Sequence, residues 1–224
     1  MNITQRLMGL DQTLVLHNEG HWDLPLDTDK PGYTSFNDAG IETETGEFLY
    51  AMVRILKPTA VLETGTHIGV GAAFMGTALR DNKQGKLTTI EFIPELYARA
   101  QKRLHTDLKL SQYVETVLGD VKDYQPTGKY QLILLDTEPQ TRFAELLKFY
   151  DSLEEGGYLF IHDLHFHMHQ IPNEEHGFAW PYGVLPEAIK ELVRSGKLRP
   201  MHFPTPRGLT GFYKVAEKDY KWTR

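Results

Sequence analysis

Four acidic residues each lie at, or just beyond, the end of a short apolar run in the sequence. They are Glu91, Asp120, Asp136 and Asp163. Ionised carboxylates accept hydrogen bonds from hydroxyl groups, exchange protons with a reacting group, or bind hard cations. A single acidic residue at such a place usually caps the next helix, but several in succession indicate a common cleft.

The glycine-rich turn before the first of these carboxylates narrows the choice of ligand. It reads Glu63-Thr64-Gly65-Thr66-His67-Ile68-Gly69-Val70-Gly71. A dinucleotide fingerprint G-x-G-x-x-G fails here, because the third and sixth positions counted from Gly65 are His67 and Val70. A phosphate loop also fails, because Gly-Lys-Ser/Thr is absent. What remains is close backbone approach at Gly65 and a helix opened by Gly69 and Gly71, which suits the carboxylate of a small zwitterion.

A phosphate-free nucleoside with an amino-acid tail fits this turn together with Glu91, which is placed to accept both hydroxyls of a ribose. S-adenosylmethionine (SAM) is such a molecule. We therefore expect the cofactor SAM to contact a set of residues around the strand ends: Glu63, Gly65, Thr66, His67, Gly69, Gly71, Glu91, Phe92, Asp120 and Asp136.

The same turn, extended back to Val61, resembles the first SAM motif of class I methyltransferases, particularly the small-molecule O-methyltransferases of the catechol and caffeoyl-CoA type. Glu91 matches the acidic ribose-binding position of that family, and Gly119-Asp120 matches its adenine-side motif. The resemblance covers about residues 48–163. It implies a Rossmann-like methyltransferase fold, SAM as the methyl donor, and transfer of the methyl group to a hydroxyl.

A metal site is the next expectation. Asp136 and Asp163 end neighbouring strands, so their carboxylates could share one hard cation such as magnesium. In metal-dependent O-methyltransferases these two positions would be ligands, and a third ligand often lies beside the second. We take this third ligand to be His162, whose imidazole shifts the preference towards manganese or another transition metal. The alternative is that Asp136 caps the next helix and Asp163 binds backbone amides.

Transfer to a hydroxyl group also needs a base that takes its proton. Glu138 lies two residues beyond Asp136, the offset at which macrocin-type sugar O-methyltransferases carry an acidic residue that looks like the general base. Catechol-type enzymes instead carry a lysine three residues after the Asp, where this chain has Pro139. His165 is the second candidate base. It lies in a histidine-rich segment, residues 162–176, that could equally be a polar loop over the cleft.

These residues are positioned by a chain in which short apolar runs alternate with helical repeats. The predicted strands are 60–62, 87–90, 113–118, 131–135, 158–161, 201–203 and 210–215, and the predicted helices are about 45–56, 72–79, 94–108, 143–150 and 185–194. Near-continuous apolar strands that alternate with helices indicate a doubly wound, mostly parallel sheet of the α/β class. The short link between the last two strands predicts an antiparallel closure of a seven-stranded sheet.

Composition limits the class of protein further. The 224 residues are 41% hydrophobic, enough for one domain over 1–224, with 1–44 as an N-terminal extension or lid and 45–224 as the SAM-binding core. A net charge of −6 without a basic run argues against a nucleic-acid partner. The absence of cysteine excludes disulfides and thiolate metal sites. No apolar run suits a membrane span or a signal peptide, so we expect a cytoplasmic protein without a membrane partner.

The sequence therefore predicts a SAM-dependent methyltransferase that acts on a hydroxyl of a small molecule, assisted by a divalent metal. Three alternatives stay open: a metal-independent N- or C-methyltransferase, a non-catalytic SAM-binding module, and a nucleotide-sugar or dinucleotide enzyme. A homodimer is a family expectation. No readable pattern in the sequence identifies the methyl acceptor.

Overall fold

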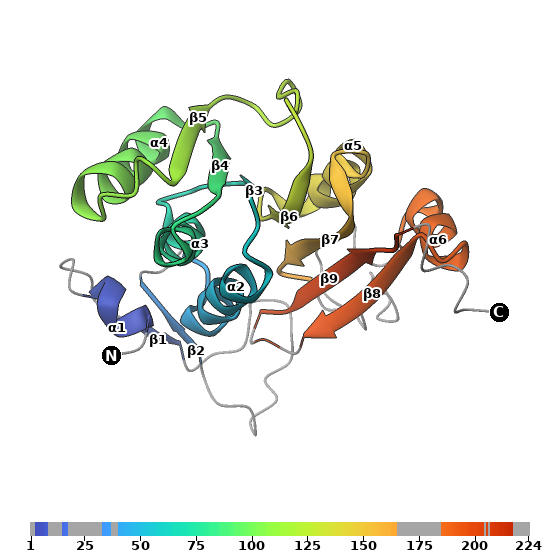
Figure 1. Cartoon of the computed structure of the whole chain (residues 1–224), viewed down its shortest axis with the longest axis horizontal. Coiled ribbons are helices and arrows are strands. Elements are labelled where there is room, and N and C mark those ends of the chain that lie inside the picture. Colours follow the sequence, from blue (N-terminus) through green and yellow to red (C-terminus); the bar gives the residue numbers. More distant parts are fainter. Residues whose placement is uncertain are drawn as a thin grey trace.

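The computed structural model describes residues 3–8, 15–17, 33–36, 40–164, 185–203, 205 and 207–216. Its main strands are β3 (Ala60–Thr64), β4 (Lys86–Glu91), β5 (Val114–Leu118), β6 (Tyr130–Leu135), β7 (Leu153–His162), β8 (Leu198–Phe203) and β9 (Leu209–Lys214). They form a seven-stranded sheet in the order β5-β4-β3-β6-β7-β9-β8 (Figure 1). Strands β3 to β7 are parallel, whereas β9 is antiparallel to both β7 and β8. The predicted fold class is confirmed.

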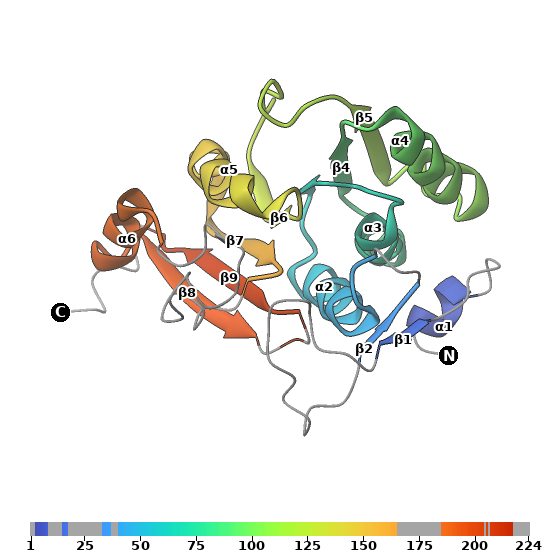
Figure 2. The same ribbon diagram turned by 180° about the vertical axis from the view of Figure 1, so that it is seen from behind.

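Helices cover both faces of this sheet (Figures 1 and 2). They are α2 (Thr43–Leu56), α3 (Val70–Asn82), α4 (Pro94–Gln101), α5 (Arg142–Phe149) and α6 (Glu187–Arg194). Successive strand residues alternate between two clusters: Val61 packs with residues of α2 and α3, and Leu62 packs with residues of α5 and α6. Since neighbouring side chains of a strand point to opposite faces, two buried faces require near-continuous apolar strands, as the sequence has.

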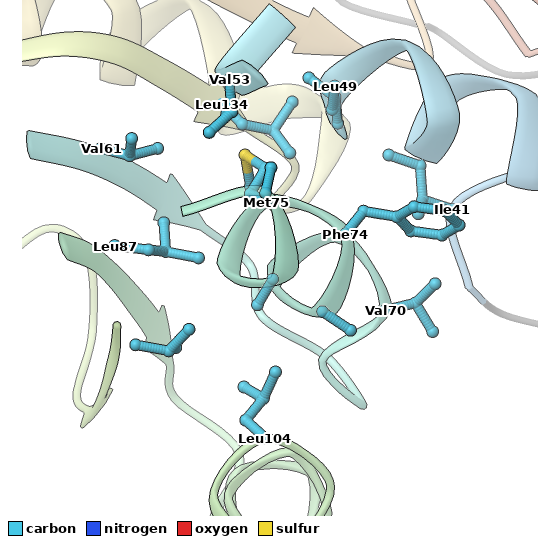
Figure 3. Close-up of a cluster of buried hydrophobic side chains, with 14 of the residues drawn as sticks. Ile41, Leu49, Val53, Val61, Val70, Phe74, Met75, Leu87, Leu104 and Leu134 are labelled. Atoms are coloured by element: carbon cyan, nitrogen blue, oxygen red, sulfur yellow. The ribbon is translucent and has the colours of Figure 1, made fainter. Parts of the chain in front are cut away.

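Helix α3 lies in the middle of one layer and is buried on all sides. Every residue from Val70 to Leu79 is buried. Figure 3 shows Phe74 of this helix pointing towards Ile41. Leu104, in the helical segment directly after α4, faces α3 from the other side. A helix that is apolar all round is expected where neighbours enclose it. Its N-terminus is thereby fixed against the sheet edge at which the predicted ligand turn lies.

The N-terminal residues, predicted to be irregular, contain three short elements in their described part: α1 (Ile3–Met8), β1 (Val15–His17) and β2 (Tyr33–Ser35). The two strands pair antiparallel. Helix α1 is tied to α2 by a hydrogen bond of 2.5 Å from Thr4 Oγ1 to Glu47 Oε1, and to α3 by an ion pair of 2.6 Å between Arg6 and Asp81. Elements this short show no periodicity in a sequence, so the expectation of an irregular segment was wrong for these residues.

Elsewhere the predicted elements are confirmed with shifts at their ends. Strand β7 begins at Leu153 rather than near Tyr158, and the helix predicted over 94–108 continues beyond α4 as a π-helical stretch, Lys102–Asp107. Within the described residues, none of the helices combines the length and the apolar character that a bilayer crossing requires.

Candidate active site

The carboxyl ends of four parallel strands lie side by side at one edge of the sheet. Thr64 of β3 pairs with Ile90 of β4 and with Leu135 of β6, and Leu135 pairs in turn with Ile161 of β7. The residues that follow these positions therefore lie at one level: Gly65, Glu91, Asp136 and His162. The chain first builds the sheet outwards from β3 through β4 to β5 and then returns to β6 on the other side of β3. Open α/β sheets bind ligands at such a switch point.

Two cavities open at this edge and share Gly65 in their walls. The larger, of about 470 Å³, has apolar side chains in its lining, among them Ile90, Leu96 and Val121. The smaller, of about 150 Å³, lies towards the N-terminus of α3 and has Arg207 in its wall. Of the residues predicted to contact SAM, the larger cavity is lined by Gly65, His67, Glu91, Phe92, Asp120 and Asp136, and the smaller adds Glu63, Thr66 and Gly71.

The backbone at Gly65 has a shape that favours glycine. Its φ is 80°, and a Cβ added there would lie 2.2 Å from the carbonyl oxygen of Asp136. The amide of Gly65 donates to the carbonyl oxygen of Ile90 at 3.0 Å. The turn is therefore fixed to β4 and packed against β6, and only a residue without a side chain leaves the junction of the two cavities open.

The other two glycines of the turn differ in what they contact. Gly69 caps the N-terminus of α3 with a φ of 82° and is not among the residues that line either cavity. A Cβ on Gly69 would lie 3.3 Å from Leu104, so this residue serves the packing of α3. A Cβ on Gly71 would lie 2.4 Å from Glu63 Oε1, within the wall of the smaller cavity.

Glu91 holds the ligand turn in place. Its Oε2 accepts a hydrogen bond of 2.7 Å from the amide of His67, and its Oε1 accepts one of 2.9 Å from the amide of Ile93. The first of these bonds fixes His67 in the left-handed region, at a φ of 50°. An ionised carboxylate has about four acceptor positions, so Glu91 can also accept hydrogen bonds from a ligand in the larger cavity that it lines.

Glu63 is a buried acid in the wall of the smaller cavity. The residue is only 2% exposed, and its Oε2 accepts a hydrogen bond of 2.5 Å from Thr89 Oγ1. Burial raises the pKa of Glu63 to about 8, against the hydrogen bond from Thr89, and the nearby charges of Asp136 and Glu91 raise it further. The side chain is therefore mostly protonated at neutral pH, and a cationic group in this cavity would favour its ionised form.

Phe92 and Asp120 line the larger cavity beyond Glu91. Phe92 is 61% exposed, an unusual position for a phenylalanine. The Asp120 carboxylate accepts a hydrogen bond of 2.8 Å from the amide of Lys122. An aromatic ring and a carboxylate beside an apolar cavity are suited to the flat, polar-edged ring of a nucleobase.

Charged side chains close the other end of the site. We call Glu42, Asp136, Arg142, His162, Asp163 and Arg207 the ionic network. The Nη2 of Arg142 lies 3.2 Å from Asp136 Oδ1 and 3.3 Å from Asp163 Oδ2. The same guanidinium group donates from Nε to the carbonyl oxygen of Thr137 at 2.7 Å, and from Nη1 to that of His162. A single cation thus joins the ends of β6 and β7.

Arg207 brings a second guanidinium group to Asp163. Its Nη2 donates a hydrogen bond of 2.8 Å to Asp163 Oδ2, and its Nε forms an ion-pair contact of 2.8 Å with Asp163 Oδ1. The backbone amide of Arg207 donates to Glu42 Oε1 at 3.0 Å, and its Nη1 donates to the carbonyl oxygen of Gly40 at 3.2 Å. Asp163 has a φ of 53°, which is uncommon outside glycine, and its two arginine partners hold it there.

His162 is buried between two carboxylates. Its Nδ1 lies 2.9 Å from Asp136 Oδ1, and its Nε2 lies 2.5 Å from Glu42 Oε2. Burial opposes a charge on the ring, but Asp163, Glu42 and Asp136 together outweigh it and raise the pKa of His162 to about 10. Burial alone would raise the pKa of Glu42, yet the charge and hydrogen bond of His162 hold it below its usual value. Both ring nitrogens therefore face carboxylate oxygens, an arrangement that favours the protonated imidazolium form.

Asp136, His162 and Asp163 each offer one atom within 4.8 Å of the others, so the structure brings the predicted metal ligands together. Their surroundings do not suit a divalent cation. An imidazole that faces a carboxylate at each nitrogen has no lone pair to give to a metal. Arg142 lies between the two aspartates. The three side chains are gathered around a guanidinium group.

Glu42, Arg142 and Arg207 were not singled out from the sequence. Arg142 precedes Leu146 by four residues and Phe149 by seven, so it falls on the buried face of α5. Glu42 likewise lies four and seven residues before buried residues of α2. A charged residue in phase with the apolar face of a helix was the available signal. Arg207 precedes β9 in a loop and gave no such signal.

Of the two residues predicted as the general base, only Glu138 lies among the residues that the structure describes. Glu138 is exposed and lines the larger cavity two residues beyond Asp136. Its backbone carbonyl begins the short helix before α5 by accepting a hydrogen bond of 3.0 Å from the amide of Thr141. His165, with the rest of 165–184, lies outside the described residues.

The doubly wound sheet and the ligand turn at its switch point are similar to those of the Rossmann-like methyltransferase fold. Residues 62–164 match the family described as a methyltransferase domain. The structure of the O-methyltransferase TomG from Streptomyces achromogenes, in complex with SAM, is similar with a TM-score of 0.65 at 17% identity over 80% of this chain and 83% of that chain. The O-methyltransferase from Bacillus cereus, in complex with SAH, is similar with a TM-score of 0.64 at 14% identity over 80% and 84% of the two chains.

Curated relatives match a shorter part of the chain. The protein-L-isoaspartate O-methyltransferase of Methanococcus maripaludis is 37% identical over 100 residues, which are 44% of each protein. The chain spans about half the length of the curated relatives it matches. The resemblance to class I SAM-dependent O-methyltransferases is thus confirmed for the fold and for the central domain.

Proposed function

We propose that this protein is a SAM-dependent methyltransferase that acts on a hydroxyl group of a small molecule. The observation that carries the proposal is the pair of cavities joined at Gly65, one beside Glu91 and one beside Glu63. Such a pair suits a nucleoside linked to a charged amino acid. The similar O-methyltransferase structures, one with SAM and one with SAH, support the same proposal.

Residues of both cavities would hold SAM. Glu91 would accept hydrogen bonds from the ribose hydroxyls, and Phe92 with Asp120 would contact the adenine side. Glu63 would face the amino-acid tail, whose carboxylate the N-terminal amides of α3 would attract. Bound in this way, SAM supplies an electrophilic methyl group on its sulfonium.

The acceptor would lie beside Asp136, where the two cavities share their wall. Glu138 would take the proton of the acceptor hydroxyl, because it is an exposed carboxylate that lines the larger cavity two residues beyond Asp136. His165 stays the second prediction for this role. Assistance by a divalent metal would require a ligand set that the ionic network occupies, so the proposed proton transfer runs through side chains.

Calorimetric titration of the purified chain with S-adenosylhomocysteine, and separately with NAD, tests the cofactor. We expect the first to bind and the second not to, because the turn at Gly65 lacks the glycine register for a pyrophosphate. Labelled SAM with a set of phenols, sugars and amines then tests the reaction. Methylation of oxygen supports the proposal, whereas methylation of nitrogen or carbon favours the alternative transferase. NAD binding in place of S-adenosylhomocysteine would overturn the proposal.

Glu138→Gln tests the base. We expect kcat to fall by about 10²–10⁴-fold with an unchanged affinity for S-adenosylhomocysteine, since the variant loses a proton acceptor and keeps its shape. Glu95→Gln, an exposed residue of α4, is the matched control and should leave both quantities unchanged. A kcat close to that of wild type in Glu138→Gln would remove Glu138 from this role.

A further inference from the structure

We propose that the guanidinium group of Arg142 is the cation of the acceptor end, and that this site works without a bound divalent metal. The proposal rests on the proposed function for its catalytic meaning. Metal binding itself can be measured without turnover, so the two can fail separately.

Arg142 occupies the position that a metal shared by β6 and β7 would need. Its Nη2 lies 3.2 Å from Asp136 Oδ1 and 3.3 Å from Asp163 Oδ2, and the side chain is only 4% exposed. An arginine in a protein keeps its positive charge at every working pH. The two strand-end carboxylates therefore always have a cation between them.

The position of Arg142 is fixed by its other nitrogens. Nε donates to the carbonyl oxygen of Thr137 at 2.7 Å, and Nη1 donates to the carbonyl oxygen of His162. Both acceptors belong to the segments that carry the aspartates. If the guanidinium group moved aside for a metal, buried donors and carbonyl oxygens would lose their partners, which is costly.

The remaining predicted ligands are also engaged. Asp163 forms an ion pair with Arg207, in which Nε lies 2.8 Å from Oδ1 and Nη2 lies 2.8 Å from Oδ2. His162 faces Asp136 with Nδ1 at 2.9 Å and Glu42 with Nε2 at 2.5 Å. A dication placed among these groups would have two guanidinium groups as near neighbours, and like charges repel strongly where little water screens them.

This arrangement has a consequence for the acceptor. Arg142 lines both cavities, so its positive charge lies beside an acceptor oxygen that binds there. A nearby guanidinium charge lowers the pKa of a hydroxyl less than direct coordination to a metal does. The acceptor proton must then pass to a side-chain base, and methyl transfer should persist in the presence of a chelator.

The test is a titration of chelator-treated, desalted protein with Mn²⁺, in which electron paramagnetic resonance measures the free ion. Wild type is expected to leave the free Mn²⁺ signal unchanged. Binding of one Mn²⁺ per chain that is lost in Asp136→Asn would overturn the proposal. A wild type that leaves the free Mn²⁺ signal unchanged supports the proposal even where a variant fails to fold.

Arg142→Ala provides the second arm, because it removes the guanidinium group that lies between the carboxylates of Asp136 and Asp163. A folded Arg142→Ala protein is expected to bind Mn²⁺, and failure to do so would show that Arg142 does not exclude the metal. Arg199→Ala, at an exposed position of β8, is the matched control and should behave as wild type. Calorimetry with S-adenosylhomocysteine on the same samples reports separately on the proposed function.

Discussion

Replacing Glu63 by glutamine is expected to remove a pH-dependent loss of stability. Burial raises the pKa of this carboxyl in the folded protein from an ordinary 4.5 to about 8. The folded state therefore holds the proton more tightly than the unfolded chain does. Such a group contributes stability that is complete below its ordinary pKa and is lost as the pH rises towards the folded pKa.

The size of the effect follows from the width of this window. One pKa unit corresponds to about 1.4 kcal/mol, so a rise from about pH 5 to about pH 7 should lower the free energy of unfolding by on the order of 2 kcal/mol. His162, with its pKa raised from 6.5 to about 10, acts in the same direction but only above its ordinary value. His67 acts in the opposite direction below its ordinary value, because burial lowers its pKa. The difference in slope between wild type and Glu63→Gln therefore reports on Glu63.

Urea unfolding of the ligand-free protein, followed by circular dichroism at a series of pH values, measures this dependence. In Glu63→Gln the fall in the free energy of unfolding across this window should be smaller than in wild type by on the order of 2 kcal/mol, and the amide oxygen still accepts the hydrogen bond from Thr89. Glu95→Gln, at an exposed position, should keep the wild-type slope. Parallel curves for wild type and Glu63→Gln would refute the reasoning.

Three further substitutions test other parts of the site. Gly65→Ala should lower the free energy of unfolding by more than about 2 kcal/mol in the same urea assay, because a Cβ at positive φ meets a backbone carbonyl. Gly128→Ala is the control and should leave the free energy of unfolding unchanged, because no heavy atom lies within 4 Å of its new Cβ. Glu91→Ala should weaken SAM binding in calorimetry by ~1 to 3 kcal/mol, the scale of a lost charged hydrogen bond, and an unchanged affinity would count against the ribose assignment. Glu42→Gln should lower the pKa of His162 in an NMR titration, because it removes one of the carboxylates that stabilise the charged ring, and an unshifted pKa would contradict the ionic description.

The parts of the site that sequence analysis located are those that depend on local pattern. Buried parallel strands are short apolar runs, so the ends of β3, β4 and β6 could be found from the positions of these runs in the sequence. The first residue after such a run must lie at the carboxyl edge, which places Glu91 and Asp136 without any knowledge of packing. The close backbone approach that was expected at Gly65 agrees with its positive φ in the turn that leads out of β3.

The ionic network could not be derived in this way, because its members meet only through tertiary structure. Glu42 and His162 are 120 residues apart in the chain. Arg207 reaches Asp163 because β9 pairs antiparallel with β7, with Leu209 opposite His162. The sequence predicted an antiparallel pair of the last two strands, β8 and β9, but gave neither the partner of β9 in the rest of the sheet nor its register. A shift in register would move Arg207 away from the strand ends.

The two arginines at this edge have a structural role that a metal ion could not fill. A metal ion can neutralise two carboxylates, but it cannot donate hydrogen bonds. The two arginines neutralise Asp163 and also donate to backbone carbonyl oxygens: Arg142 to those of Thr137 and His162, and Arg207 to that of Gly40. Gly40 lies in the wall of the smaller cavity, so the groups that balance the charge at the acceptor end also hold the segment that closes it. Charge balance and cavity closure therefore depend on the same side chains, and a change in one alters the other.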